Sequence, residues 1–376
     1  MVVPARLTRL LQEAVASQVT PGAVVLASRS GERAAVREGW VATHGGDGRL
    51  LAPQDRRQVE PTLRYDLASL TKVVSAITVL RLVDEQVLAI DTPVAQWLPD
   101  FGSGDKRRIT LRMLLSHTAG LVPTWPGWRD YARARARSAP EPSRAEILRQ
   151  LLAVPLDTAP AQRLSYSCMG YIVAGTVAER AARTSWDELV RTRVLEPLGL
   201  RHTGCRPSDP LDCAPTEFEP QWGRGMIRGV VHDETAWALH GISANAGLFA
   251  SADDVQRLGE AIARGLPGVL SEQSWDLLWN DQLPRVLGPA RAAEETRRNG
   301  FGQSCGLRIG QLSFMGEHCE AARGHTGFTG TSLVIEADRV TVTTLLTNRV
   351  HPTREGVGVM PLRAAVAQAV RQGWER

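Results

Sequence analysis

Residues 65–72 of the 376-residue chain read Tyr65-Asp66-Leu67-Ala68-Ser69-Leu70-Thr71-Lys72, with a lysine three positions after a serine. The run that follows, 73–83, is apolar on nearly every face and predicts a helix buried within a domain. Positions i and i+3 share one face of a helix, so Ser69 and Lys72 would present a hydroxyl and an amine side by side. This arrangement places a nucleophile next to a group that can activate it.

Lysine is rare in this chain. Of the 44 basic residues only Lys72 and Lys106 are lysines, and the other 42 are arginines. A desolvated lysine can lose its proton near neutral pH, whereas a guanidinium cannot, so only lysine can act as a base. We therefore expect Lys72 to take part in the reaction as a base. We expect Lys106 to be a surface charge that arginine replaces without effect. The alternative for Lys72 is an ordinary helix whose lysine reaches solvent.

Composition limits the classes of function. A hydrophobic content of 43% permits a large core, in one composite domain or two. The net charge of +4 is mild, and no aromatic residues alternate with the arginines, so no nucleic-acid partner is expected. The sequence has no apolar span of about 18 residues and does not start like a secretory signal. These features predict a cytoplasmic protein without a membrane partner, and they leave the oligomeric state open.

The number and spacing of the cysteines predict that they are reduced thiols. Their odd number and the lack of a C-x-x-C pair argue against a disulfide framework or a structural zinc site. A bridge between Cys205 and Cys213 is the alternative. The five residues are Cys168, Cys205, Cys213, Cys305 and Cys319.

The order of the expected elements predicts the fold class. Strand-like runs occur near both ends of the chain, and the pattern between residues 75 and 300 is mostly helical. We predict an α/β (α+β) fold with one antiparallel sheet built from both ends, flanked by helices. The sheet domain would comprise 1–75 and 300–376, with a large helical region, 76–299, inserted. The expected helices are 1–16 and 361–374, the expected strands are 22–28, 34–40, 304–310, 331–336 and 339–346, and the polar segment 286–299 is a mobile loop or a short surface helix.

Several separated segments carry a family resemblance. They are the S-x-x-K stretch 65–72, the segments 109–121, 166–171, 195–200 and 229–250, and His325-Thr326-Gly327. In order and spacing they resemble the serine hydrolases related to class C β-lactamases and penicillin-binding DD-peptidases, a family that also holds esterases and D-aminopeptidases. The resemblance extends from about residue 20 to 370. It implies a β-lactamase/DD-peptidase-like fold and a metal-independent enzyme without a cofactor.

The resemblance also implies catalytic roles. Ser69 would attack a carbonyl carbon, helped by the dipole of the helix that begins there. Lys72 and Tyr166 would accept and relay the proton, because a nearby ammonium stabilises a phenolate. Tyr166 is the expected counterpart of the family's catalytic tyrosine. The alternative is a core or loop tyrosine, since Tyr171 lies close by in the sequence.

The His325-Thr326-Gly327 segment resembles the family's strand that lines the site. Glycine there permits close approach of the backbone to a ligand. The backbone amides of Phe328 and Ser69 would form the oxyanion hole. His325 would orient the substrate or the tyrosine hydroxyl, and the alternative is a surface histidine on an edge strand.

Cys168 departs from the family pattern. Many members carry Tyr-x-Asn, whose amide holds the acylamino side chain of a β-lactam or peptide. A thiol is a poor replacement for a group that both donates and accepts. The expected function is therefore a serine hydrolase of esters or amides, most simply a β-lactamase-like esterase. The alternatives are a β-lactamase, a D-aminopeptidase or DD-carboxypeptidase, or a catalytically weak sensor that binds β-lactams.

His117 is expected to be structural and not part of a Ser-His triad. The run His232-Asp233-Glu234 suggests a metallohydrolase as a further alternative, although adjacent residues seldom converge on one ion. The pocket walls are expected to come from loops 122–164 and 284–303. Tryptophans of the pocket or of the core would include Trp125, Trp128, Trp222 and Trp237.

Overall fold

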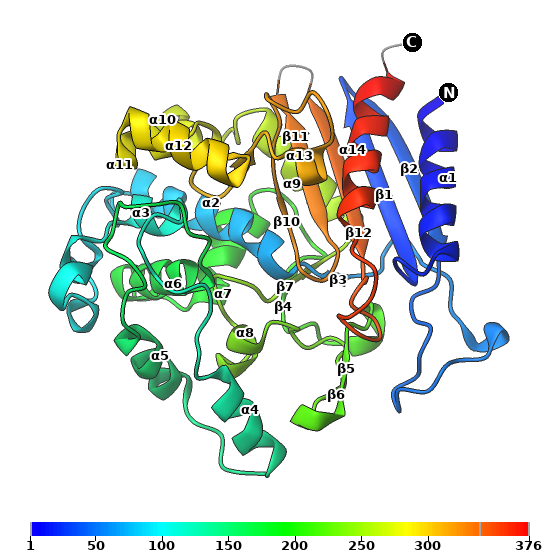
Figure 1. Ribbon diagram of the computed structural model, residues 1–376, viewed down its shortest axis with the longest axis horizontal. Helices are drawn as coiled ribbons and strands as arrows, with labels where there is room; N and C mark the ends of the chain where they lie inside the picture. The colour runs from blue at the N-terminus through cyan, green and yellow to red at the C-terminus, as the bar shows by residue number, and fades with distance from the viewer. Residues whose placement is uncertain (1, 338–339, 375–376) are drawn as a thin grey trace.

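A central antiparallel sheet joins the two ends of the chain (Figure 1). The computed structural model describes residues 2–337 and 340–374. The seven strands follow the order β2-β1-β12-β11-β10-β9-β8, and Val25 of β1 faces Leu345 of β12. The predicted sheet built from both ends is therefore confirmed. Its strands are β1 (Gly22–Arg29), β2 (Glu32–Gly39), β8 (Gly302–Gln303), β9 (Arg308–Ile309), β10 (Arg323–Thr326), β11 (Ser332–Glu336) and β12 (Thr341–Thr347).

Helices cover both faces of this sheet. One face carries α1 (Val2–Ala16) and α14 (Met360–Gly373), and the other carries α9 (Ala252–Ala263). Successive side chains of a strand point to opposite faces. Accordingly, Val25 belongs to the core with α1 and α14, whereas Val24 belongs to the large core that includes α9. Burial on both faces explains why β1 is apolar without alternation.

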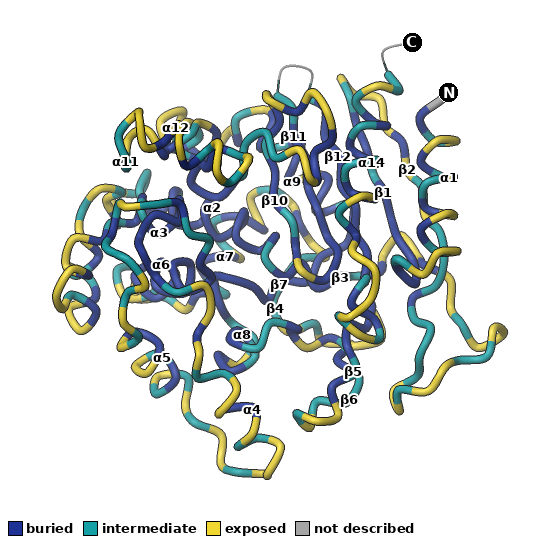
Figure 2. Tube along the Cα trace, in the orientation of Figure 1, coloured by how far each residue is buried: buried dark blue, intermediate teal, exposed yellow. Residues whose placement is uncertain are grey.

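The catalytic candidates lie on the helical side of the sheet. Helix α2 (Thr71–Asp84) is buried along most of its length and contacts α6 (Cys168–Ala182), as the dark tube in Figure 2 shows. The other helices are α3 (Leu111–Leu115), α4 (Trp128–Ala136), α5 (Arg144–Ala153), α7 (Trp186–Val190), α8 (Glu234–Ala238), α10 (Glu272–Trp279), α11 (Leu283–Leu287), α12 (Pro289–Asn299) and α13 (Leu312–Met315). Short strands add β3 (Tyr65–Asp66), β4 (Gly204–Cys205), β5 (Phe218–Glu219), β6 (Gly225–Met226) and β7 (Leu248–Ala250).

One expected strand is shorter in the structure, and one segment with two expected forms is a surface helix. The strand expected over 304–310 keeps strand geometry only at Arg308–Ile309. The chain bends at Gly306, where φ is +114° and an added Cβ would lie 2.6 Å from the Cβ of Ala76. The segment 286–299 is mainly the helix α12. In the strand expected over 339–346, Arg339 lies outside the described residues. The division into two regions at 75 and 300 stays a prediction.

Lys106 is not a surface residue. Its exposed fraction is 7%, its Nζ donates a hydrogen bond to the carbonyl of Leu152 at 2.7 Å, and its ammonium lies 4.9 Å from the ring centroid of Phe101. Burial lowers the pKa of this lysine. The expectation of a freely replaceable surface charge is therefore wrong. The contact with the Leu152 carbonyl joins residues 46 positions apart, and no pattern in the sequence predicts it.

All five cysteines are free thiols, as expected, so Cys205 and Cys213 form no bridge. None of the described helices has both the length and the apolarity that crossing a bilayer demands. The expected cytoplasmic location stays a prediction.

Candidate active site

Ser69 lies in a tight turn directly before helix α2. The turn is a short 3₁₀ segment, 68–70, and Ala68 has a φ of +46°, a conformation that costs energy for a residue with a side chain. The Asp66 carboxylate supports it: Oδ1 accepts from the Ala68 N–H at 2.8 Å, and Oδ2 accepts from the His232 N–H at 2.7 Å. Ser69 is thus fixed at the positive end of the helix dipole.

Lys72 contacts Ser69 as the i, i+3 spacing predicts. The lysine is fully buried, and its Nζ lies 2.9 Å from Ser69 Oγ. The same nitrogen donates to the carbonyl of Asn245 at 2.9 Å and to Cys168 Sγ at 3.4 Å. A buried ammonium requires such partners, because an unpaired one is costly. The alternative in which Lys72 reaches solvent is wrong.

Tyr166 completes the group. Its ring centroid lies 5.1 Å from Lys72 Nζ. The residue directly precedes α6, and Ser167 caps that helix by accepting from the Gly170 N–H at 3.3 Å. Ser167 Oγ in turn donates to the Val122 carbonyl at 2.7 Å. The start of α6 therefore positions Tyr166 beside the lysine and the serine.

The buried pair Lys72 and Tyr166 holds its protons at neutral pH. Burial alone lowers the pKa of Lys72, but the Cys168 thiol and the Tyr166 phenol act in the opposite direction, and the net pKa is raised. Burial raises the pKa of Tyr166, opposed by Lys72 and Arg308. The structure thus differs from the simple expectation that desolvation frees a neutral lysine. The two groups share a titration and should be treated as a unit.

Two neutral histidines flank Tyr166. The ring centroids of His117 and His325 lie 4.5 Å and 6.2 Å from that of Tyr166. Burial, together with the charges of Lys72 and Arg308, lowers the pKa of both histidines well below the usual value. His117 Nδ1 accepts from the Ser167 N–H, whereas His325 Nδ1 lies 2.8 Å from the Thr326 carbonyl. His117 therefore supports the tyrosine, and His325 is a buried residue of an interior strand, not an edge-strand surface histidine.

The strand segment that contains His325 is tied to the serine turn. Gly327 is required because an added Cβ would lie 2.2 Å from the carbonyl oxygen of Leu67. The close approach is thus to the serine turn itself. Thr331 Oγ1 donates to the same Leu67 carbonyl at 3.0 Å, and Thr329 Oγ1 donates to the Asp66 carbonyl at 2.7 Å. These bonds set the position of Phe328 relative to Ser69.

Two backbone N–H groups remain available near Ser69. Within the described part of the chain, the amides of Ser69 and Phe328 have no hydrogen-bond acceptor. The carbonyl of Gly327, which shares a peptide group with the Phe328 N–H, accepts from Arg363 Nη2 at 2.6 Å. This hydrogen bond fixes the orientation of the peptide group and therefore of the Phe328 N–H on its other side. This geometry suits an oxyanion hole.

A cleft of about 300 Å³ opens at this site. Its walls differ from those expected. No residue of the loops 122–164 and 284–303 lines the cleft, and none of the four named tryptophans does. Trp125 is instead a core residue. The lining combines Ser69 and Tyr166 with the end of β10, the turn that follows it, Arg308 of β9 and the C-terminal part of the chain. The lining residues are Ser69, Tyr166, Arg308, Thr326, Gly327, Phe328, Arg349, Gly358, Val359, Met360 and Arg363.

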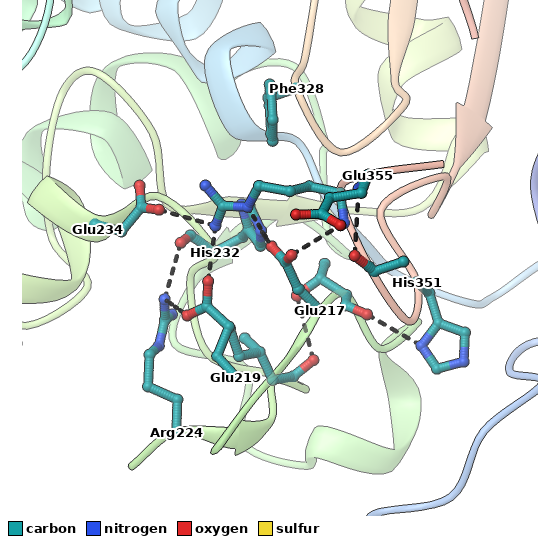
Figure 3. A network of polar contacts seen from close by, with 12 residues as sticks. Glu217, Glu219, Arg224, His232, Glu234, Phe328, His351 and Glu355 are labelled. Atoms are coloured by element: carbon teal, nitrogen blue, oxygen red, sulfur yellow. Dashed lines mark hydrogen bonds and ion pairs between the residues drawn. The ribbon is translucent and has the colours of Figure 1, made fainter. Parts of the chain in front are cut away.

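The histidine run 232–234 does not converge on one point. His232 Nε2 lies 2.9 Å from Glu217, and Glu234 pairs with Arg354 (Figure 3). Asp233 caps α8 by accepting from the Ala236 N–H. Glu217, Glu219 and His232 do offer ligand atoms within 4.8 Å of one another. Their carboxylates are occupied by guanidinium groups, from Arg354 on both and from Arg224 on Glu219. This network instead supports the Phe328 ring, which stacks on His232 at 5.7 Å.

Comparison with known proteins identifies the family. Residues 7–368 match the family model described as beta-lactamase. The chain belongs to this family. Esterase EstB of Burkholderia gladioli is 32% identical over 327 residues, which cover 79% of this chain and 78% of that protein. A putative D-alanyl-D-alanine carboxypeptidase of Escherichia coli (strain K12) is 28% identical over 338 residues, covering 84% of this chain and 75% of its own.

Solved structures agree on the fold. EstCE1, a hydrolase with promiscuous acyltransferase activity, has a TM-score of 0.74 at 23% sequence identity, with 98% of both chains covered. The predicted family, fold class and enzyme class, a β-lactamase-like serine hydrolase, are confirmed. Sequence reasoning missed the arginines of the cleft and the Asn245 carbonyl. A backbone carbonyl leaves no trace in a sequence, and three arginines do not stand out among 42.

Proposed function

We propose that this protein is an esterase that works through an acyl-enzyme on Ser69. The observation that carries the proposal is the 2.9 Å contact between Lys72 Nζ and Ser69 Oγ, at the start of a buried helix and beside Tyr166. A serine hydroxyl is a weak nucleophile unless a positioned base removes its proton. Lys72 and Tyr166 are the titratable groups placed to do so.

The proposed first step is attack of Ser69 Oγ on the ester carbonyl carbon. The hydroxyl proton passes to the basic form of the Tyr166 and Lys72 pair, in which the Lys72 ammonium stabilises the Tyr166 phenolate. The carbonyl oxygen, now negative, accepts from the backbone N–H groups of Ser69 and Phe328. His325, Thr326 and Gly327 border the substrate.

The same pair completes acylation by returning the proton. The alcohol leaves as the carbon to oxygen bond breaks, and it takes its proton from Tyr166. In the second half of the reaction water attacks the acyl carbon and gives a proton to the same pair. The bond between the acyl carbon and Ser69 Oγ then breaks, the pair returns the proton to Ser69, and the carboxylic acid is released. The pair thus acts as base and then as acid in each half of the reaction.

Cys168 favours esters over β-lactams. It stands where many family members carry asparagine, and its thiol contacts Lys72 at 3.4 Å. A thiol cannot hold an acylamino side chain by donating and accepting together. The name of EstB supports an ester, whereas the name of the Escherichia coli relative supports a D-alanyl peptide as the second candidate.

The test is hydrolysis of p-nitrophenyl butyrate followed by mass spectrometry. We expect wild-type turnover, a butyryl adduct on Ser69 and a fall to the spontaneous rate in Ser69→Ala. Hydrolysis that survives in Ser69→Ala would contradict the covalent mechanism. A stable adduct with a fluorescent penicillin, without turnover of any ester, would favour the sensor alternative.

A further inference from the structure

Asn245 connects Lys72 to a carboxylate that does not line the cleft. The asparagine is fully buried, and its backbone carbonyl accepts from Lys72 Nζ at 2.9 Å. Its side-chain Nδ2 donates to Asp233 Oδ1 at 3.1 Å, and its Oδ1 accepts from Ser243 Oγ at 2.6 Å. Both ends of the side-chain amide therefore have partners. A single residue thus connects the Asp233 carboxylate to the Lys72 ammonium.

The segment around Asn245 is bonded to helix α2 on both sides of that residue. The carbonyl of Ala244 accepts from Ser75 Oγ at 2.7 Å, and the N–H of Leu248 donates to Thr71 Oγ1 at 3.3 Å. Both hydroxyl groups belong to the helix that carries the lysine. The Asn245 carbonyl is therefore held against that helix by its neighbours and by its own side chain.

Asp233 is itself held by a helix cap. Its Oδ1 accepts from the Ala236 N–H at 2.8 Å at the start of α8, as well as from the Asn245 amide. The preceding residue, His232, donates its N–H to Asp66 of the serine turn at 2.7 Å. Two adjacent residues therefore support the serine turn and the lysine from one point of the chain.

Lys72 and Asp233 carry opposite charges that do not touch. Among the described side chains, none forms an ion pair with either residue. Burial lowers the pKa of Lys72, whereas the Cys168 thiol and the Tyr166 phenol raise it, and the Asp233 carboxylate adds to the rise. A nearby negative charge favours the charged form of a lysine. The carboxylate therefore helps to keep the proton on Lys72 from a distance.

We propose that Asp233 is a positioning residue of the active site, which holds the Lys72 ammonium beside Ser69 and Tyr166 through Asn245. The inference rests on the proposed esterase function and adds two residues to the support of its base. Neither residue lines the cleft. The Tyr166 phenolate needs an ammonium beside it, and a carboxylate on the lysine side favours that distribution of the shared proton.

The first variant, Asp233→Asn, separates charge from hydrogen bonding. The asparagine oxygen can still accept from Ala236 and Asn245, and asparagine caps a helix as well as aspartate does. Loss of the negative charge disfavours the protonated form of the lysine and tyrosine pair, so the pKa of the pair falls. The rising limb of kcat/KM for p-nitrophenyl butyrate should therefore move to lower pH.

Asp209→Asn is the matched control. Asp209 is exposed and caps the short 3₁₀ segment 210–212 by accepting from the Leu211 N–H at 2.8 Å. Its charge is screened by solvent, so the profile of this variant should coincide with that of the wild type. Both substitutions leave the other titratable neighbours of the pair in place. These neighbours are Cys168, Tyr171, His117, His325 and Arg308.

The second variant, Asn245→Ala, separates position from charge. It keeps the Asp233 carboxylate and the backbone carbonyl that accepts from Lys72, but it removes the amide that fixes this carbonyl. The rate should fall by about tenfold or more, because a small displacement of a catalytic group slows the reaction strongly. The rate is expressed per active serine, counted from the acylation burst, so that a loss of folded protein does not enter it.

An Asp233→Asn profile that coincides with the wild type, or that moves to higher pH, would overturn the inference. A rate per serine in Asn245→Ala equal to that of the wild type would also overturn it. Serine-dependent hydrolysis with both variants unchanged leaves the esterase standing and removes only the positioning role. If the wild type hydrolyses no ester, the esterase proposal fails. The same pH comparison on labelling of Ser69 by a fluorophosphonate, which needs the base but no ester, then decides the inference.

Discussion

Replacing Lys72 by arginine separates charge from proton transfer. The guanidinium keeps the positive charge but cannot lose it in the working pH range. Lys72 Nζ is fully buried and serves three acceptors from one atom, at 2.9 Å, 2.9 Å and 3.4 Å. The larger planar group cannot meet this arrangement. Loss of general acid and base assistance lowers rates by about 10² to 10⁴, or about 3–5 kcal/mol of transition-state stabilisation.

The assay is kcat/KM for p-nitrophenyl butyrate, with the acylation burst recorded separately. Lys72→Arg should lose the burst and at least a hundredfold in kcat/KM, by the range above. Thermal unfolding followed by circular dichroism shows whether the fold survives, and Ser69→Ala, which leaves the other contacts of Lys72 intact, serves as the comparison. A folded Lys72→Arg protein with more than a tenth of wild-type activity would refute the assignment of Lys72 to proton transfer.

Two other changes test separate parts of the structure. Because the pKa values of Lys72 and Tyr166 are raised, the pair holds its protons at pH 7, and the basic form becomes more abundant as pH rises. After subtraction of spontaneous hydrolysis, kcat/KM should therefore climb by up to about tenfold per pH unit above neutrality, and Tyr166→Phe should abolish the climb; a flat wild-type profile would contradict this. Lys106→Met removes the donor to the Leu152 carbonyl and the contact with Phe101, so the free energy of unfolding should fall by about 2–3 kcal/mol in urea titrations. A loss no larger than that of Arg9→Gln, which removes an exposed charge on α1, would show that the buried ammonium is not needed.

The sequence predicted the features that depend on residues close together in the chain. Ser69 and Lys72 meet because of helical spacing, and the apolar run after them is buried as its composition predicts. The antiparallel sheet built from both ends of the chain followed from the strand patterns there, whereas the order of its strands did not. The family resemblance placed Tyr166 beside Lys72, which no periodicity of this chain would have done.

The parts that sequence did not predict depend on contacts between distant segments. Lys106 is buried because its ammonium can donate to the Leu152 carbonyl, and no sequence pattern near either residue predicts that contact. The same holds for Arg363, which binds the carbonyl of Gly327 from the C-terminal helix. The net pKa of Lys72 also depends on neighbours brought in from another helix, which outweigh the effect of burial.

The threonine bonds between the serine turn and the β10 to β11 turn have a mechanical consequence. Thr329 and Thr331 tie the Phe328 segment to the carbonyls of Asp66 and Leu67, so we expect the amides of Ser69 and Phe328 to move together. Bending of the helical region against the sheet would then change the access to the cleft before it changed the spacing of those amides. Native-state hydrogen exchange should accordingly find the Gly327 amide, bonded to Thr331 at 2.8 Å, among the last to open. The shape of the entrance can therefore change while the Ser69 and Phe328 amides keep their spacing.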